Sequence, residues 1–157
     1  MAKVKVLFLC THNSARSQMA EGLLRHYYGD KYEAYSAGES PTRVHPLAVK
    51  VMGELGIDIS GQSSKSIEDF RGRDINVVAT VCKNTPKHSC PFCSIFPTAG
   101  TPEIIRSNIP GAKLWIEHGF DDPSEVEGSE EDRLSSFRRV RDEISEWVKA
   151  FFADLSL

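Results

Sequence analysis

The stretch Cys10-Thr11-His12-Asn13-Ser14-Ala15-Arg16-Ser17 stands between a short apolar run and an amphipathic one. The apolar run, residues 4–9, is typical of a strand buried on both faces, and the amphipathic run that begins near Arg16 is typical of a helix. A cysteine at a strand end, followed after five residues by an arginine at a helix start, suits an oxyanion-binding loop. This strand–loop–helix unit therefore predicts an α/β fold with its site in the loop.

Each part of this loop favours anion binding. Its backbone N–H groups can turn inward together, and the helix behind it adds unpaired N–H groups and the positive end of its dipole. The planar guanidinium of Arg16 fits a tetrahedral oxyanion. The same positive surroundings favour the thiolate form of Cys10, which would make it a nucleophile, and Ser17 can donate a hydrogen bond to the sulfur. The predicted oxyanion-binding residues are Thr11, His12, Asn13, Ser14, Ala15, Arg16 and Ser17.

A simpler interpretation of Cys10 stays open at this point. Free cysteines often behave as small apolar residues, and one at the end of a buried strand needs no other role. The position between a strand pattern and a helix pattern favours the functional interpretation.

Length and composition indicate one globular domain over residues 1–157. The chain is 40% hydrophobic and has a net charge of −3, with both signs interspersed. No basic stripe is present, which argues against nucleic acid or an anionic membrane as a partner. The early apolar run of six residues is too short for a signal peptide or a membrane span, so we expect a cytoplasmic protein. We also expect a monomer. Four cysteines in such a chain indicate catalysis, redox chemistry or metal binding rather than a disulfide framework.

Apolar patterns predict strands that alternate with helices along the chain. Strands are expected at residues 4–9, 32–37, 77–81 and 114–116, and helices at residues 16–28 and 46–55, with a long final helix capped by Ser129. In the helix at 46–55, we expect Val49, Met52 and Leu55 to face inward. The alternation predicts a three-layer α/β/α fold with a central four-stranded parallel sheet.

Cysteines follow two different strands of this predicted sheet. Cys10 ends the first strand and Cys82 follows the strand at 77–81. Ligands of parallel sheets lie beyond the carboxyl ends of the strands, so both cysteines can share one pocket. Residues 83–111 then break the pattern with five prolines and two further cysteines, Cys90 and Cys93. Long irregular segments in compact domains are often functional, and we predict a flexible loop that carries these cysteines beside the site.

Three of these cysteines can form a redox relay. If the central atom of the bound anion can be reduced, Cys10 attacks it and Cys82 displaces the reduced product, which leaves a Cys10–Cys82 disulfide. Cys90 can then attack that disulfide and move it outward to Cys82–Cys90. A zinc site formed by Cys82, His88, Cys90 and Cys93 is the competing interpretation, although no second pair with zinc-ligand spacing is present.

Asp122 is a second ambiguous residue. It stands in the stretch Gly119-Phe120-Asp121-Asp122-Pro123, shortly after the last predicted strand. A carboxylic acid near the anion could protonate a departing oxygen. Asp-Pro is also a common turn dipeptide, and spacing alone favours the turn.

With these stretches in place, the chain resembles the thioredoxin-coupled arsenate reductases, which are built on the low-molecular-weight tyrosine phosphatase fold. The similarity runs nearly end to end and is carried by Cys10–Glu21 (CTHNSARSQMAE), Tyr35–Gly38 (YSAG), Gly56–Ser60 (GIDIS), Val81-Cys82 with Cys90-Pro91, Glu117–Pro123 (EHGFDDP) and Phe137–Ile144 (FRRVRDEI). The resemblance implies reduction of arsenate to arsenite for arsenic detoxification, with thioredoxin as the electron donor and without a cofactor or a metal. It implies that the catalytic residues are Cys10 as nucleophile, Arg16 as oxyanion binder, Asp122 as general acid, and Cys82 and Cys90 as the relay.

The chain departs from this family at three places, one of which is a set of insertions around Ser94 to Lys113 that lengthen the loop. Cys93 is an additional cysteine, and Cys90 keeps the matching context because Pro91 follows it. We therefore predict Cys82–Cys90 as the main exported disulfide and Cys93 as a spare redox thiol. Some members bind potassium with residues that match Asn13, Glu21, Ser36 and an aspartate. Lys65 stands at the position of that aspartate, so we expect no potassium site.

Two other functions compete with arsenate reduction. The first is hydrolysis of phosphate monoesters through a Cys10 phosphocysteine, as in the phosphatases of this fold. Those enzymes usually have aromatic residues directly after Asp-Pro, where this chain has Ser124 and Glu125. The second is a non-enzymatic oxyanion- or zinc-binding module. Phosphate and arsenate share shape and charge, so weak phosphatase activity is compatible with the first interpretation.

Overall fold

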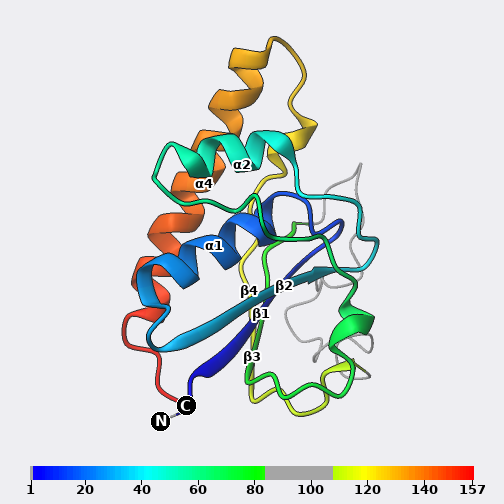
Figure 1. The fold of residues 1–157 in the computed structure, drawn as a ribbon, viewed down its shortest axis with the longest axis vertical. Coiled ribbons are helices and arrows are strands. Elements are labelled where there is room, and N and C mark those ends of the chain that lie inside the picture. Colours follow the sequence, from blue (N-terminus) through cyan, green and yellow to red (C-terminus); the bar gives the residue numbers. More distant parts are fainter. Residues whose placement is uncertain (1, 84–107) are drawn as a thin grey trace.

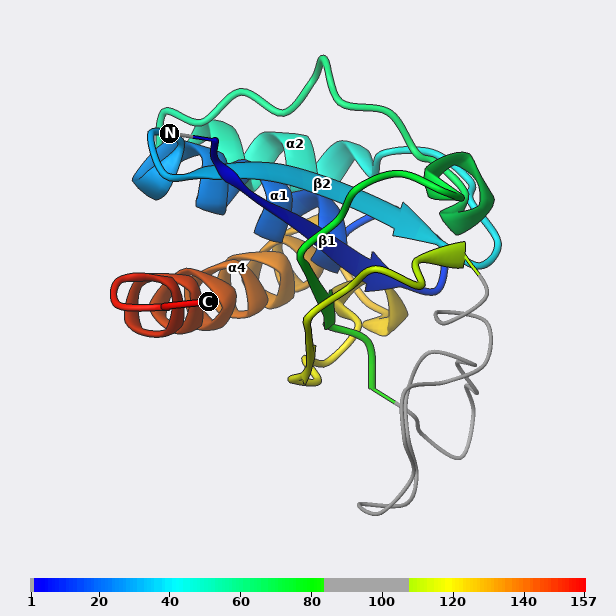
Figure 2. The ribbon, with the colours of Figure 1, turned by 90° about the horizontal axis from the view of Figure 1, so that it is seen from below.

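The computed structural model describes residues 2–83 and 108–157, and a parallel sheet of four strands forms its centre (Figure 1). The strands, in the spatial order β2-β1-β3-β4, are β2 (Tyr32–Gly38), β1 (Val4–Cys10), β3 (Val77–Thr80) and β4 (Leu114–Glu117). Every neighbouring pair is parallel. Figure 2 shows β1 and β2 ending at the same edge of the sheet. The predicted α/β class with a central four-stranded parallel sheet is confirmed.

Three α-helices pack together with the sheet. They are α1 (Arg16–Tyr28), α2 (Pro46–Gly53) and α4 (Glu130–Phe152). α1 contacts β1, β2 and α4, and α2 contacts α4. The ring of Phe8, in β1, lies edge-on against Trp147 and Phe152 of α4, at centroid distances of 6.2 and 5.9 Å. α1 and α4 thus form a layer over one face of the sheet.

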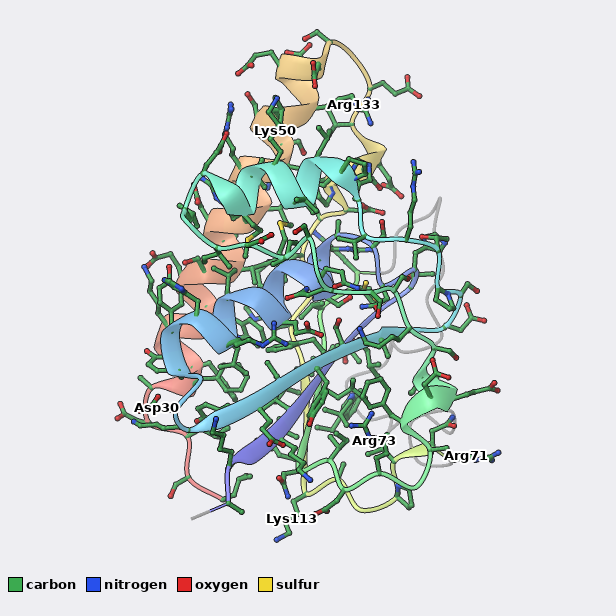
Figure 3. The ribbon with its side chains drawn as sticks, in the orientation of Figure 1. Asp30, Lys50, Arg71, Arg73, Lys113 and Arg133 are labelled. Carbon is green, nitrogen blue, oxygen red and sulfur yellow. The ribbon has the colours of Figure 1, made fainter. Side chains whose placement is uncertain are left out.

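On the opposite face of the sheet, a 3-10 helix, η1 (Ile67–Phe70), packs against β2. Side chains of a strand alternate between its faces, so Tyr32 and Tyr35 of β2 point to opposite sides. Tyr32 contacts Phe152 of α4, whereas Tyr35 contacts Phe70 of η1 at 5.8 Å. Arg73, labelled in Figure 3, lies over both the Tyr35 and Phe70 rings. In β1, all residues from Val6 to Cys10 are buried, whichever face they point to, as its nearly continuous apolar run predicts.

The helix predicted at residues 46–55 is two residues shorter than expected, and one of its inward residues was assigned wrongly. α2 ends at Gly53, and Leu55 is 40% exposed. A turn ends the helix: the N–H groups of Leu55 and Ile57 both donate to the carbonyl of Met52, and Gly56 has a φ of +77°. Ile57 enters the core in place of Leu55. The buried face of α2 is Leu47, Ala48, Val51 and Met52, so Val49 is only half-buried.

The N-terminus of α4 agrees with the prediction. Ser129 caps the helix: its hydroxyl accepts a hydrogen bond from the N–H of Asp132 (3.1 Å), and the Asp132 carboxylate accepts one from the N–H of Ser129 (3.3 Å). Phe137, Val140, Ile144 and Val148 form the buried stripe of this helix. Within residues 2–83 and 108–157, no helix is both long and apolar enough to cross a lipid bilayer.

Candidate active site

The loop between β1 and α1 turns its carbonyl groups away from its centre. Four carbonyls in succession accept hydrogen bonds from the surrounding chain: Thr11 from Ser40 N (2.9 Å), His12 from Thr42 N (3.2 Å), Asn13 from the Gln18 amide (3.0 Å) and Ser14 from His45 N (2.9 Å). The N–H and C=O of a trans peptide point in opposite directions, so the N–H groups of residues 12–15 face the inside of the loop. Inward N–H groups of this kind bind anions.

The N-terminus of α1 adds to this positive region. Ala15 is the N-cap residue and provides no side-chain hydrogen bond to the first turn, which also contains no acidic residue. The first N–H groups of the helix and the positive end of its dipole are therefore available to an anion in the loop.

Cys10 lies at the base of this loop with its thiol held by Ser17. The residue is 2% exposed, and its Sγ is 2.8 Å from Ser17 Oγ. The direction of that hydrogen bond follows from Asn13. Lys65 N, which can only donate, binds Asn13 Oδ1 at 2.8 Å, so Asn13 Nδ2 faces Ser17 Oγ and donates to it at 2.8 Å. The Ser17 hydroxyl hydrogen is left to point at the sulfur, which stabilises a thiolate.

The end of β2 approaches the loop so closely that a side chain would not fit. A Cβ atom added at Gly38 would lie 2.8 Å from Asn13 N, 2.8 Å from Thr11 O and 3.0 Å from Cys10 O. All three are backbone atoms, which cannot move aside as the end of a side chain can. The absence of a side chain at Gly38 therefore allows the loop to keep its conformation.

This contact yields a prediction for Gly38→Ala. The added methyl group would displace the loop and misalign its N–H groups, so we expect phosphate affinity to fall at least about tenfold, equivalent to one lost charge-assisted hydrogen bond. Calorimetric titration with phosphate would measure this. Gly53→Ala is the matched control, because nothing lies within 4 Å of the added carbon there. Equal phosphate affinity in the two variants would contradict the proposed constraint.

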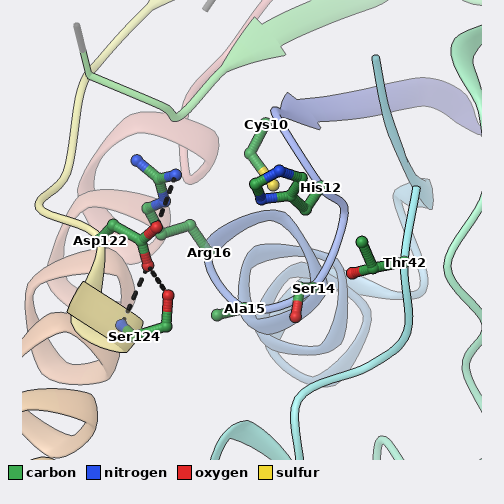
Figure 4. A pocket seen from close by; sticks show the side chains of 8 residues that line it. All are labelled: Cys10, His12, Ser14, Ala15, Arg16, Thr42, Asp122 and Ser124. Carbon is green, nitrogen blue, oxygen red and sulfur yellow. Dashed lines mark hydrogen bonds and ion pairs between the residues drawn. The ribbon is translucent and has the colours of Figure 1, made fainter. Parts of the chain in front are cut away.

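Arg16 and Asp122 meet at the mouth of the loop (Figure 4). Arg16 Nη2 is 3.6 Å from Asp122 Oδ2, and Arg16 Nη1 donates to the carbonyl of Phe120 at 3.2 Å. Asp122 Oδ1 accepts from the Ser124 N–H (3.0 Å) and hydroxyl (2.7 Å), which makes Asp122 the N-cap of a second 3-10 helix, η2 (Pro123–Glu125). One carboxylate therefore makes two sets of contacts: Oδ1 forms the turn, and Oδ2 faces Arg16.

A cavity of about 60 Å³ opens above Cys10. This is several times the roughly 10–15 Å³ that one water molecule needs. The residues that line the cavity, all drawn in Figure 4, are Cys10, His12, Ser14, Ala15, Arg16, Thr42, Asp122 and Ser124. The structure thus brings together the predicted residues Cys10, Arg16 and Asp122. The sequence analysis did not predict Thr42, which belongs to no motif. It noted Ser124 only because the phosphatases of this fold usually have an aromatic residue at that position.

Cys82 lies just after the end of β3, the strand that pairs with β1. Val81 N donates to Leu9 O of β1 at 2.9 Å, so the chain continues alongside β1 up to Cys82, which is a buried thiol, 1% exposed. The next residue, Lys83, donates to Asp121 at 3.0 Å. His88, Cys90 and Cys93, together with most of the loop predicted at 83–111, lie outside the described residues.

An ionic bridge connects the chain after Cys82 with the segment that carries Asp122. Asp121 accepts from Lys83 and also from Arg139 of α4, at 3.3 Å. The Lys83 ammonium, and to a smaller extent Arg139, hold the pKa of Asp121 below its usual value. Asp121 is half-exposed, so each pair contributes little to stability.

Lys65, whose backbone N–H binds Asn13, places its side chain beside the carboxylate of Glu21. Its ammonium is 3.9 Å from Glu21 Oε1, and the Ser36 hydroxyl donates to the same oxygen at 2.9 Å. Burial lowers the pKa of Lys65, although the Glu21 carboxylate opposes this shift. The Lys65 ammonium therefore lies beside Glu21. In some members of the family that the chain resembles, the residue matching Glu21 is expected to bind potassium.

Comparison with known proteins agrees with this geometry. The family model described as low molecular weight phosphotyrosine protein phosphatase matches residues 5–157. The chain is 42% identical over 151 residues to an arsenate reductase of Halalkalibacterium halodurans, and the match covers 96% of each protein. A solved arsenate reductase in the phosphate binding state is 34% identical with a TM-score of 0.73, covering 98% of this chain and 99% of that one. Another, in the oxidized state, is 34% identical with a TM-score of 0.70, covering 97% and 98%.

The protein belongs to the low molecular weight phosphotyrosine protein phosphatase family. Within that family it is similar in sequence, at 42% and 41% identity, to two arsenate reductases over nearly their whole length. The resemblance inferred from the motifs is confirmed.

Proposed function

We propose that this protein reduces arsenate to arsenite and so contributes to arsenic detoxification. One observation carries the proposal: a buried nucleophilic thiol in an oxyanion loop, Cys10, stands beside a strand that leads to a second buried thiol, Cys82. Hydrolysis of a phosphate ester needs only the first thiol. Reduction needs two, because two electrons must pass to arsenic.

In the first step, the loop binds arsenate and Cys10 acts on it. Inward N–H groups and the Arg16 guanidinium hold the oxyanion above the sulfur, and the Ser17 hydrogen bond maintains the thiolate. The thiolate attacks arsenic and forms an S–As bond. The hydroxyl group that leaves takes a proton from Oδ2 of Asp122, which becomes a carboxylate, and departs as water.

In the second step, Cys82 attacks the sulfur of Cys10. The S–As bond breaks and its electron pair stays on arsenic, which passes from As(V) to As(III) and leaves as arsenite. The two sulfurs have together lost two electrons and form a Cys10–Cys82 disulfide.

We propose that Cys90 then attacks Cys82 and releases Cys10 as a thiol, which moves the disulfide outward. A dithiol protein of the thioredoxin type would reduce the resulting Cys82–Cys90 bond, with Cys93 as a spare thiol. Support comes from the order of the chain, since Cys90 lies in the segment that directly follows Cys82. A similar arsenate reductase has been solved in the oxidized state.

Phosphate-ester hydrolysis is the second candidate, favoured by the shared loop and Asp122. The cavity argues against phosphotyrosine as its main substrate. Its lining residues include no phenylalanine, tyrosine or tryptophan within the part of the chain that the structure describes. Among these described lining residues, an aryl ring would find only the imidazole of His12 as an aromatic partner.

A thiol count tests the proposed function. Reduced protein, freed of reductant, is mixed with one equivalent of arsenate, and free thiols and arsenite are then measured. We expect two thiols lost for each arsenite released. If no arsenite is released and all four thiols stay free, the result would favour the phosphatase or a simple oxyanion-binding module. Stoichiometric zinc in the purified protein would favour the zinc-binding module.

A further inference from the structure

The hydrogen bonds behind Cys10 continue beyond Asn13 to the surface of the protein. Gln18 Nε2 donates to Asn13 O (3.0 Å), to Asn13 Oδ1 (2.9 Å) and to Ser63 O (2.9 Å). Gln62 Nε2 in turn donates to Gln18 Oε1 at 2.7 Å, and Arg25 Nη1 donates to Gln62 Oε1 at 2.9 Å. Asn13, Ser17 and Gln18 are all completely buried.

Each amide in this chain of hydrogen bonds has only one workable orientation. Gln18 Nε2 faces two backbone carbonyls, Asn13 O and Ser63 O, which can only accept. Gln62 Nε2 faces the backbone carbonyl Gln18 O at 3.1 Å, and Gln62 Oε1 faces the Arg25 guanidinium, which can only donate. A reversed amide at any position would bring two donors or two acceptors together.

Asn13 needs such support because of its backbone. Its φ is +48°, in the left-handed region, and it is the one non-glycine residue with positive φ in the described part of the chain. Asparagine adopts this conformation more readily than most residues, yet the position must be held by its surroundings. Gln18 contacts both the main-chain and the side-chain carbonyl of Asn13, so one amide fixes its backbone and its amide orientation together.

We infer that Gln18 is a positioning residue for the Cys10 thiolate and that Gln62 holds Gln18 in place. Gln18 fixes Asn13, Asn13 occupies the acceptor site of the Ser17 hydroxyl, and the hydroxyl hydrogen is thereby directed to the Cys10 sulfur. The effect reaches the nucleophile rather than the anion, since neither glutamine lines the cavity. The inference rests on Cys10 as the nucleophile of the proposed function.

The test replaces each glutamine by methionine, which has similar size and donates no hydrogen bond. In Gln18→Met, we expect alkylation of Cys10 by iodoacetamide at pH 7 to slow about tenfold, and its pH profile to move to higher pH, because one hydrogen bond to a charged group is weakened. Mass spectrometry of the Cys10 peptide separates this reaction from alkylation of the other cysteines. We expect kcat for arsenate to fall in parallel, while KM changes less than about twofold, since the loop N–H groups and Arg16 remain.

Gln62→Met should change the same two readouts in the same direction by about two- to threefold, because it removes only the support behind Gln18. His26→Gln, at an exposed position of α1, is the matched control and should change neither. Because Gln62 is only partly buried, its variant keeps the test decisive if Gln18→Met fails to fold. Alkylation profiles equal to that of His26→Gln, or a rise in KM with kcat unchanged, would overturn the inference. Alkylation needs no substrate, so a wrong assignment of arsenate as substrate would leave this readout intact.

Discussion

Cys82→Ser is expected to abolish arsenate reduction under turnover while hydrolysis of a phosphate ester stays within about twofold, because that hydrolysis uses only the first thiol. In this variant Cys10 can still bind and attack arsenate, but no second thiolate can displace arsenic from its sulfur. The measurement compares the rate of arsenite release with the rate of phosphate release from a monoester, in the same preparation. Serine is close in size to cysteine, and the position is 1% exposed, so packing changes little.

Cys10→Ser is the comparison that gives this experiment its meaning. It removes the nucleophile that both reactions need, so both activities should disappear together. If Cys82→Ser also eliminates both, Cys82 holds the structure of the strand end and the relay is wrong. If arsenite release continues in Cys82→Ser, another thiol performs the second step.

Asp122→Asn should lower hydrolysis of an alkyl phosphate by about 10²–10⁴-fold, the range typical of a lost general acid. Arsenate reduction should fall as well, since an oxygen must also leave arsenic as water. Asparagine keeps a carbonyl oxygen that can accept from the Ser124 N–H and hydroxyl, so the cap of η2 is retained, while the proton donor and the negative charge beside Arg16 are removed.

Ser124→Ala is the matched control for Asp122→Asn. It removes the hydroxyl contact of 2.7 Å to Oδ1 and leaves the acid in place. We expect a rate within about tenfold of the parent enzyme, because a neutral hydrogen bond contributes only about 0.5–1.5 kcal/mol. An effect of Asp122→Asn no larger than that of Ser124→Ala would return Asp122 to the role of a turn residue.

The sequence allowed prediction of those parts of the fold that depend on local pattern. Residues 4–9 are apolar except for Lys5, which is typical of a strand covered on both faces, and Ser129 followed by Asp132 forms a capping box. The end of α2 was placed wrongly because Leu55 continues the helical period. The outcome depended on Ile57, which competes for the same core position once Gly56 allows the turn.

The residues of the candidate site also divide into those that a local motif predicts and those that only the fold brings to the site. Cys10 and Arg16 belong to one contiguous motif, and Asp122 follows a strand whose end faces the same edge. Thr42 and Gln62 come from segments without a recognisable pattern, and only the folded chain brings Thr42 to the cavity and Gln62 to Gln18. Gln18 is a polar residue inside an amphipathic helix, and its sequence position alone does not reveal three backbone and side-chain acceptors around it.

β1 and β3 are hydrogen-bonded neighbours, and this pairing has a kinetic meaning for the proposed relay. In an unfolded chain, bringing Cys10 and Cys82 together would cost loop-closure entropy. Folding meets that cost before arsenate arrives, so the proposed attack of Cys82 on Cys10 would be a unimolecular step. Well-placed groups reach effective concentrations up to about 10⁵–10⁸ M. Small thiols in free solution compete poorly against such a neighbour, so the internal cysteine decides the fate of the arsenic-bearing intermediate.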